Sequence, residues 1–342
     1  MTTQRPTRVL VVDDSAFARK VLRETLSVST DLEVVGVARD GLEALEKISE
    51  LKPDVVTLDL VMPNLDGIGV LRALPPVGAP RVVVVSISDG NSVLGIEALQ
   101  MGAVDIVQKP TALATDRLYE MSAELVAKVI AAGASRPRIG EPPVARPIQR
   151  RAAGRTRLVV IGASTGGPQA LTRLLTALPA GLPCGIAIAL HIPAGYTEAL
   201  ARRLDEACAV HVVEASDGAE LLPGEVMIAR GGNHLRLRAQ GRRFVAELDH
   251  TPVLSGFCPS VDVLFQSAAE AGGASVLGVV LTGMGNDGVE GARAIAQARG
   301  RTLTEAEESC VVYGMPRAVV EAELSVGEAP IEAMADKIVE SL

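Results

Sequence analysis

Residues 9–15 read VLVVDDS, four hydrophobic residues followed directly by two aspartates and a serine. A short run of this kind predicts a buried strand that ends in polar side chains. The pattern returns four times before residue 110, with hydrophobic runs over 32–37, 55–60, 81–87 and 104–107. Helix-like segments separate or follow these runs, over 18–26, 42–51, 68–74, 93–101 and 118–132. The alternation predicts a (βα)5 domain, a parallel sheet with helices on both faces.

Polar side chains that can bind metal or phosphate gather at one edge of this predicted sheet. Asp13 and Asp14 end the first strand, Asp59 lies near the end of the third, Ser86 ends the fourth, and Lys109 follows the fifth. The carboxyl ends of parallel strands meet at one edge, so these groups should lie together. Clustered carboxylates favour a hard cation such as Mg²⁺, beside which one of them could attack a phosphoryl group.

The segments VVDDS, DLVMPNLDG and QKP resemble those of two-component receiver domains over about residues 8–130. The resemblance implies that Asp59 accepts the phosphoryl group and that Asp13, Asp14 and Asp59 bind Mg²⁺. It also implies that Ser86 and Lys109 contact the phosphoryl group. Receivers usually carry Tyr or Phe three residues before the lysine, and this chain has Ile106 there.

A basic, proline-rich stretch divides the chain. Residues 131–158 hold seven arginines and four prolines against one acidic residue. Prolines fix φ and remove donors, so this stretch predicts an extended linker. The predicted domains are therefore a receiver at 1–132 and a second domain at 157–342, joined by a linker at 133–156.

The second domain repeats the alternation of strands and helices. Strands are expected over 158–163, 186–191 and 276–282, and shorter ones over 212–215, 225–229, 235–238 and 243–248. Helices are expected over 169–178, 198–206, 261–271 and 288–298. The pattern favours a doubly wound, mostly parallel α/β domain.

Ser164 is the candidate nucleophile of this domain. Residues 162–166 read GASTG and match G-x-S-x-G between a predicted strand and a predicted helix, a turn that exposes the serine at a helix N-terminus. Free N–H groups there could stabilise an oxyanion. The alternative is a glycine-rich turn that binds phosphate or a dinucleotide; it ranks second, because the dinucleotide motif requires glycine where Ser164 stands.

A serine nucleophile needs a base and a group that orients it. Among the four histidines, His191 ends a hydrophobic strand, whereas His234 is expected in a polar turn. Asp287 follows the strand at 276–282 and is the candidate acid, although an aspartate before a helix is as often only an N-cap.

The segments GASTGGPQAL, HIPAGYTEAL and LTGMGNDGVEGA resemble the catalytic motifs of the chemotaxis protein-glutamate methylesterases, the CheB family. The resemblance covers most of residues 157–342 and implies Ser164 as nucleophile, His191 as general base, Asp287 as orienting carboxylate and the Met284 backbone as an oxyanion donor. It implies a phosphorylation-activated serine esterase that hydrolyses glutamate γ-methyl esters on chemoreceptors, deamidates receptor glutamines and is phosphorylated by a chemotaxis histidine kinase.

Composition limits the other function classes. The net charge is −8 and aromatic residues make up 2% of the chain, which disfavours nucleic acid as a partner. The N-terminus lacks the apolar core of a signal peptide, so a cytoplasmic location without membrane insertion is expected. The competing hypothesis is a response regulator whose second domain only binds a partner.

Overall fold

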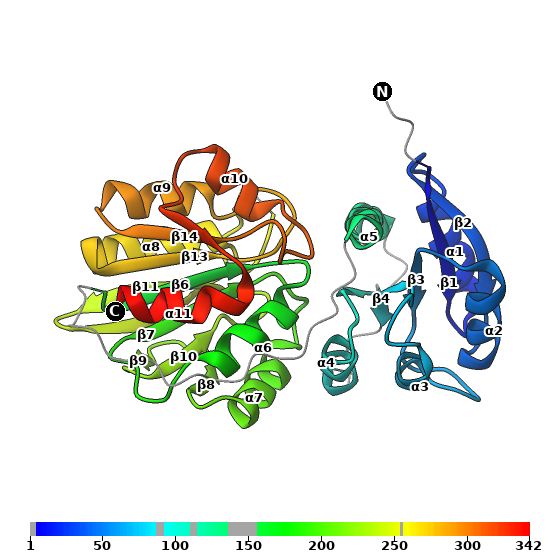
Figure 1. Cartoon of the computed structure of the whole chain (residues 1–342), viewed down its shortest axis with the longest axis horizontal. Coiled ribbons are helices and arrows are strands. Elements are labelled where there is room, and N and C mark those ends of the chain that lie inside the picture. Colours follow the sequence, from blue (N-terminus) through cyan, green and yellow to red (C-terminus); the bar gives the residue numbers. More distant parts are fainter. Residues whose placement is uncertain (1–4, 87–91, 110–114, 136–155, 254–255) are drawn as a thin grey trace. The chain divides into compact units, whose positions relative to one another are not determined.

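The computed structural model describes residues 5–86, 92–109, 115–135, 156–253 and 256–342. It divides into two compact units, Met1–Ile139 and Gly140–Leu342 (Figure 1). The predicted linker at 133–156 lies almost entirely outside the described residues, so the three predicted boundaries stay predictions. No helix among the described residues is both long enough and apolar enough to cross a membrane.

The N-terminal unit is a five-stranded parallel sheet in the order β2-β1-β3-β4-β5. Its strands are β1 Thr7–Val12, β2 Leu32–Ala38, β3 Val55–Leu58, β4 Arg81–Ser86 and β5 Asp105–Gln108. Its helices are α1 Ala16–Leu26, α2 Gly41–Leu51, α3 Gly67–Ala73, α4 Ser92–Gln100 and α5 Thr115–Ala134. Helix α1 packs beside α5, and α3 packs between α2 and α4. The predicted (βα)5 fold is confirmed.

Sequence chemistry explains why the helices of this unit begin where they do. The side chains of Ser15, Asp40 and Asp66 accept hydrogen bonds from backbone N–H groups in the first turns of α1, α2 and α3. Such N-caps satisfy donors that would otherwise have no partner. Ser15 lies two residues after Asp13, so the first βα turn both caps a helix and carries carboxylates.

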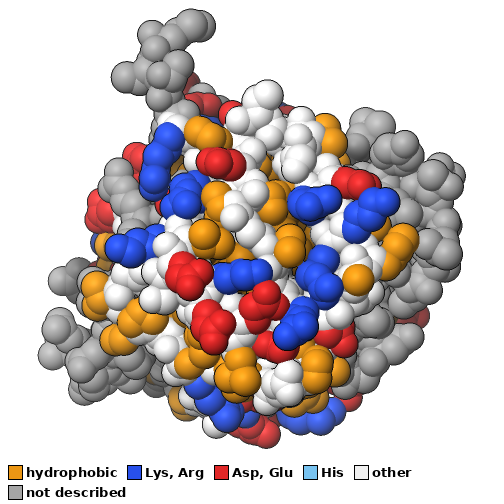
Figure 2. Space-filling view, turned by 90° about the vertical axis from the view of Figure 1, so that its right-hand side faces the viewer, with side chains coloured by type: hydrophobic (Ala, Val, Ile, Leu, Met, Phe, Trp, Pro, Cys, Tyr) orange, Lys and Arg blue, Asp and Glu red, His pale blue; other side chains and the backbone are white. Residues whose placement is uncertain are grey.

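Figure 2 shows the surface of this unit from the side of β2 and α2. Lys and Arg side chains are interspersed there with Asp and Glu, and hydrophobic side chains occur between them. The described part of that face therefore presents no continuous basic area of the kind that binds nucleic acid.

The C-terminal unit is built on a seven-stranded parallel sheet in the order β15-β14-β13-β6-β7-β10-β8. Its strands are β6 Leu158–Ala163, β7 Gly185–Leu190, β8 His211–Glu214, β10 Glu225–Ile228, β13 Val276–Val280, β14 Arg301–Glu305 and β15 Gly327–Ala329. A separate antiparallel sheet contains β9 Glu220–Leu221, β11 His234–Gln240 and β12 Arg243–Asp249. The predicted shorter strands thus belong to two different sheets.

Helices cover both faces of the large sheet (Figure 1). On one face α6 Gly167–Ala177 lies between α7 Thr197–Ala207 and α11 Ile331–Ser341. On the other face α9 Val289–Gln297 lies between α8 Val261–Gly272 and α10 Met315–Glu321, and α8 also packs on β11. The doubly wound, mostly parallel α/β fold is confirmed.

The strand order of the large sheet reverses beside β6. From β6 the chain adds β7, β10 and β8 on one side and β13, β14 and β15 on the other. In such sheets, ligands bind at the carboxyl ends of the strands where the order reverses. The loops that follow β6, β7 and β13 are therefore the place to look for a site.

Candidate functional site

Ser164 and His191 are the first residues after two adjacent central strands. Ala163 of β6 pairs with Leu190 of β7, and the His191 N–H donates to the Ala163 carbonyl at 3.0 Å. On the other side of β6, the Ser164 N–H donates to the Thr282 carbonyl at 3.0 Å, in the loop after β13. The backbone thus holds the predicted nucleophile between the segments that carry the predicted base and acid.

The turn after Ser164 requires small residues. Gly166 is the N-cap of α6 with φ of +78°, and a Cβ atom added there would lie 2.5 Å from the Val311 side chain. A Cβ atom added to Gly283 would lie 2.7 Å from the Cβ atom of Ser164 itself. Any larger side chain at either position would displace the serine or its surroundings.

Three backbone N–H groups close to Ser164 have no acceptor among the described residues. The N–H groups of Thr165, Gly166 and Met284 donate to no atom of the residues that the structure describes. Two of them directly precede α6, whose N-terminal dipole favours negative charge. Free, fixed donors beside a nucleophile are what an oxyanion needs.

His191 and Asp287 form a hydrogen-bonded pair. Nε2 of His191 lies 2.8 Å from Oδ2 of Asp287, and both side chains are buried. The other ring nitrogen, Nδ1, is also buried and has no hydrogen-bond partner among the described residues. With the ring proton on Nε2, toward the carboxylate, Nδ1 carries the lone pair that can accept a proton.

The first turn of α8 holds the Asp287 carboxylate. Oδ2 accepts a hydrogen bond from the Val261 N–H at 2.8 Å, and Oδ1 accepts from the Asp262 N–H and the Ser260 hydroxyl, each at 3.0 Å. Burial alone would raise the pKa of Asp287, but the hydrogen bonds from His191 and these N–H groups lower it to about 2. Asp287 is therefore ionised at neutral pH.

Asp287 is not the N-cap of the helix that follows it, which was the alternative role considered for this residue. The N-cap of the following helix α9 is Gly288, which has no side-chain cap. Asp287 instead accepts hydrogen bonds from the first-turn N–H groups of α8, whose N-cap is Ser260. In turn, Asp262 of α8 accepts hydrogen bonds from the N–H groups of Gly288 and Gly291 at 2.9 and 2.7 Å. A carboxylate at the start of each helix thus accepts hydrogen bonds from N–H groups at the start of the other, and we call this arrangement the crossed caps.

The crossed caps place two carboxylates close together, which gives a prediction for stability. Burial, and next the charge of Asp287, raise the pKa of Asp262 from 3.8 to about 6 despite its two backbone hydrogen bonds. A pKa raised in the folded state contributes stability below pH 4 that is lost as the pH rises through 6. In Asp262→Asn this dependence disappears while the acceptor oxygen remains.

We therefore expect the free energy of unfolding of Asp262→Asn to exceed that of the natural chain by about 1–2 kcal/mol between pH 4.5 and 8. This energy is reduced to allow for the partial exposure of Asp262 to solvent. Urea unfolding at several pH values measures this difference. Asp205→Asn is the control with the opposite sign, because backbone and His211 hydrogen bonds lower the pKa of Asp205. If the free energy of unfolding depends on pH in the same way for the natural chain and for Asp262→Asn, the prediction is wrong.

Two residues near the predicted triad were not foreseen. His234, expected in a polar turn, is the first residue of β11, is 1% exposed, and accepts the Ser260 N–H on Nδ1 at 3.1 Å. Phe257 stacks on His191, with ring centroids 4.0 Å apart and planes at 11°. Phe257 belongs to no helix or strand, so no periodic pattern could have indicated it.

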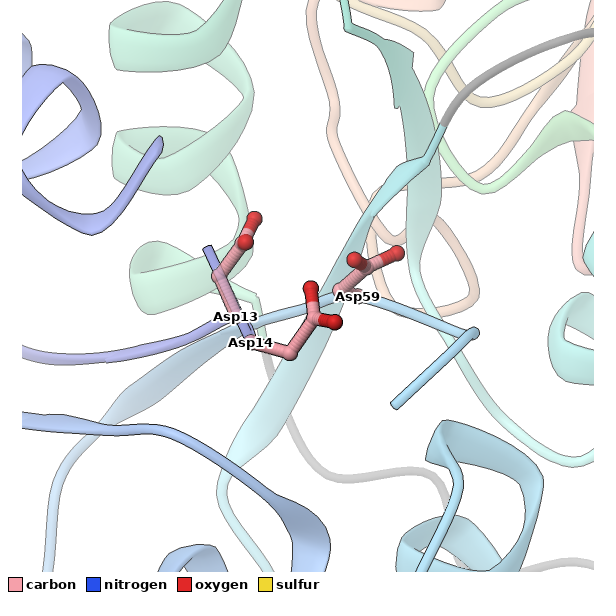
Figure 3. A group of neighbouring side chains, drawn as sticks. All are labelled: Asp13, Asp14 and Asp59. Atoms are coloured by element: carbon pink, nitrogen blue, oxygen red, sulfur yellow. The ribbon is translucent and has the colours of Figure 1, made fainter. Parts of the chain in front are cut away.

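The predicted acidic cluster of the N-terminal unit is also present. Carboxylate oxygens of Asp13, Asp14 and Asp59 lie within 4.8 Å of one another at the carboxyl ends of β1 and β3 (Figure 3). The Lys109 ammonium lies 2.5 Å from Asp13 and 2.7 Å from Asp59. Burial raises the pKa of Asp59, Lys109 opposes this, and the charge of Asp13 adds to it. Three convergent carboxylates are typical of a Mg²⁺ site.

Ser86 and Ile106 lie on the neighbouring strands. Ser86 ends β4, and its hydroxyl is buried without a hydrogen-bond partner among the described residues. Ile106 is fully buried on β5, and its carbonyl accepts a hydrogen bond from the buried ammonium of Lys128 on α5 at 2.8 Å. The position usually held by an aromatic side chain is thus filled by a packed aliphatic one.

Comparison with known families assigns a different family to each of the two compact units. The C-terminal unit matches the CheB methylesterase family over residues 159–338. The N-terminal unit matches the response regulator receiver domain family over residues 9–121.

Individual relatives match the whole length. A Myxococcus xanthus protein named protein-glutamate methylesterase/protein-glutamine glutaminase 5 is 61% identical over 341 residues, which is 98% of this chain and 97% of that protein. A Thermotoga maritima protein named protein-glutamate methylesterase/protein-glutamine glutaminase is 40% identical over 99% of both chains. The crystal structure of the Thermotoga maritima CheB methylesterase catalytic domain matches with a TM-score of 0.54 and 38% identity, over 55% of this chain and 99% of that one.

Proposed function

Because the chain belongs to the CheB methylesterase family and begins with a receiver domain, we propose that Ser164, His191 and Asp287 carry out its reaction and that Asp59 controls it. The chain is a protein-glutamate methylesterase and protein-glutamine glutaminase that acts on chemoreceptors. The observation that supports the residue assignment best is the junction of β6, β7 and β13, where the three side chains follow three adjacent strands.

The proposed reaction proceeds through an acyl-enzyme. Nδ1 of His191 accepts the Ser164 hydroxyl proton while the serine oxygen attacks the γ-carbonyl carbon of the methylated glutamate. The protonated imidazole, paired with Asp287 through Nε2, then gives the proton to the departing methoxide, and methanol leaves. Water activated by Nδ1 cleaves the acyl-enzyme to give glutamate. With glutamine as substrate the same steps release ammonia.

The transition state carries negative charge on the former carbonyl oxygen. We assign its stabilisation to the Met284 N–H, with donors at the start of α6 nearby. Their support is that they have no acceptor among the described residues, and that Gly283 packs against Ser164 directly before Met284. Donors aligned before the reaction stabilise the transition state more than the uncharged ester.

In the receiver domain, Asp59 is the proposed phosphoacceptor and a chemotaxis histidine kinase the proposed phosphodonor. Asp13, Asp14 and Asp59 fit Mg²⁺ because their oxygens converge within one coordination sphere. The bound ion would neutralise charge on the phosphoryl oxygens. The proposed phosphoryl contacts are Lys109, already in contact with Asp13 and Asp59, and Ser86, whose hydroxyl has no partner in the part of the chain that the structure describes.

Regulation follows from joining the two domains in one chain. A tethered receiver is held at high effective concentration beside its output domain, so even weak inhibition would be effective. We propose that the unphosphorylated receiver restrains the esterase and that phosphorylation of Asp59 relieves the restraint. A tenfold activation requires only about 1.4 kcal/mol of difference between the two states.

A shortened chain that begins at Thr156 should therefore hydrolyse methyl esters faster than the unphosphorylated full-length chain, roughly tenfold at the coupling given above. A related catalytic domain has been solved by itself, which supports independent folding. A small phosphodonor should accelerate only the full-length chain. If the shortened chain is folded and no faster, receiver inhibition is wrong and activation must arise from positive contacts.

Methanol release from a methylated chemoreceptor is the direct test of the reaction. The full-length chain with phosphodonor and Mg²⁺ should release methanol, and ammonia from a receptor that carries glutamine at the same positions. A chain that binds the receptor but releases neither product would instead support the second-domain binding module.

A further inference from the structure

Building on the proposed function, we propose that Phe257 is a positioning residue for catalysis because it holds the imidazole plane of His191. The two rings are stacked, with centroids 4.0 Å apart and an interplanar angle of 11°. Phe257 has no group that can exchange a proton. Its influence on the reaction must therefore pass through the position of His191.

The imidazole needs such a restraint. Rotation of a histidine ring about its Cβ–Cγ bond is broad and roughly two-fold, so the bond itself does not select one orientation. Among the described residues the ring has one hydrogen bond, from Nε2 to Asp287, and none at Nδ1. A half-turn would replace Nδ1 by a C–H group and remove the bond to Asp287. Such a ring could neither accept the Ser164 proton nor pair with the acid.

A flat aromatic neighbour opposes turning of the ring out of its plane. A complete half-turn returns the ring to the same plane, so the choice between the two orientations is left to the hydrogen bond with Asp287. At a centroid distance of 4.0 Å the rings are in contact, so turning the imidazole out of its plane would drive it into the phenyl ring. The stack restrains the ring face, while Asp287 restrains its edge. These two contacts act on different motions, and in the proposed mechanism both hold Nδ1 where it accepts the Ser164 proton.

Phe257 is itself well placed to act as a support. It lies three residues before Ser260, the N-cap of α8, and the carbonyl of Cys258 accepts a hydrogen bond from the Gly232 N–H at 3.2 Å. The segment 257–262 therefore contacts both members of the His191–Asp287 pair, one through a ring and the other through N–H groups. Phe257 remains 36% exposed, although a phenyl ring gains most from full burial.

The kinetic test compares Phe257→Ala, Phe257→Tyr and Leu222→Ala in the full-length chain with phosphodonor. Leu222 is a matched control, because it is 47% exposed and precedes β10. It therefore lies at the amino ends of the strands, whereas the site lies at their carboxyl ends. Phe257→Ala should lose about tenfold in kcat with KM within about twofold, the size expected when an aromatic pair that orients a reacting group is removed. Phe257→Tyr, which keeps the ring, and Leu222→Ala should stay within about twofold of the natural chain.

A spectroscopic test does not depend on activity. A phenyl ring stacked at this distance shields the imidazole protons, so their NMR signals should lie upfield and move downfield in Phe257→Ala but not in Leu222→Ala. His191→Gln assigns the signal among the four histidines. An unchanged kcat, a loss confined to KM, or an unmoved signal would each overturn the proposal. If the natural chain itself lacks Ser164-dependent methanol release, the proposed function fails, and the NMR test of the stack still applies.

Discussion

Ser164→Ala is expected to remove nearly all methylesterase activity, a loss on the order of 10⁴–10⁶ in kcat. Without the hydroxyl there is no atom to form the acyl-enzyme, and the backbone donors alone can provide only a small residual acceleration over water. Methanol release from a methylated receptor measures the loss. The site should stay folded, because the Ser164 side chain is small and its backbone N–H still bonds Thr282.

The double variant Ser164→Ala/His191→Ala should be hardly worse than either single one, since the two side chains act as a unit. Asp287→Ala should leave more activity, because His191 retains its stack on Phe257 even when its acid is lost. Ser267→Ala is the control: this buried serine of α8 bonds Leu237 and Leu264, away from the triad, and should retain the natural rate. Near-natural activity of Ser164→Ala would reject the mechanism.

Asp59→Asn is expected to abolish Mg²⁺-dependent labelling of the chain by a small phosphodonor. The amide is isosteric but cannot form the acyl phosphate, and it removes one of three carboxylates that fit the metal. Retained phosphate on the intact protein measures the effect, and chelation of Mg²⁺ should abolish labelling of the natural chain as well.

Asp66→Asn provides the matched comparison, since this aspartate caps α3 and lies outside the acidic cluster. It should be labelled normally. The esterase rate of Asp59→Asn without phosphodonor should equal that of the unphosphorylated natural chain. Labelling that persists in Asp59→Asn would move the acceptor elsewhere, with Asp13 and Asp14 the first residues to test.

Strand ends were the part of the site that sequence reasoning could predict. The predicted strands end at 12, 60, 163 and 191, and Asp13, Asp59, Ser164 and His191 lie at or next to those ends. Parallel strands gather such residues at one edge. That rule brings Asp13 to Asp59 and Ser164 to His191 without knowledge of any long-range contact.

The end of the chain shows where this reasoning stops. Strand β14 contains Thr302, Thr304 and Glu305, which are almost fully buried although they are polar. Their burial is made possible by partners elsewhere in the chain: Glu305 accepts the Thr282 N–H, and Thr304 bonds Ser325. A hydrophobic pattern cannot indicate a strand whose interior is polar, so β14 was not predicted.

The role of Asp287 was ambiguous for a related reason. Locally, an aspartate before a helix predicts an N-cap, and nothing within a few residues contradicts this. The decisive contacts come from Ser260, Val261 and Asp262, about 25 positions earlier, together with His191 from β7. Only the folded chain brings these donors to one carboxylate.

The crossed caps have a consequence for cooperativity. If the first turn of α8 opens, Asp287 loses its donors, and Gly288 and Gly291 lose the acceptor supplied by Asp262. The starts of α8 and α9 are therefore coupled and open as one local unit. Because Asp287 belongs to that unit, the proposed triad would be lost while either helix frays at its N-terminal end. Catalytic activity would thus depend on the intact first turns of α8 and α9, although neither helix supplies a reacting group.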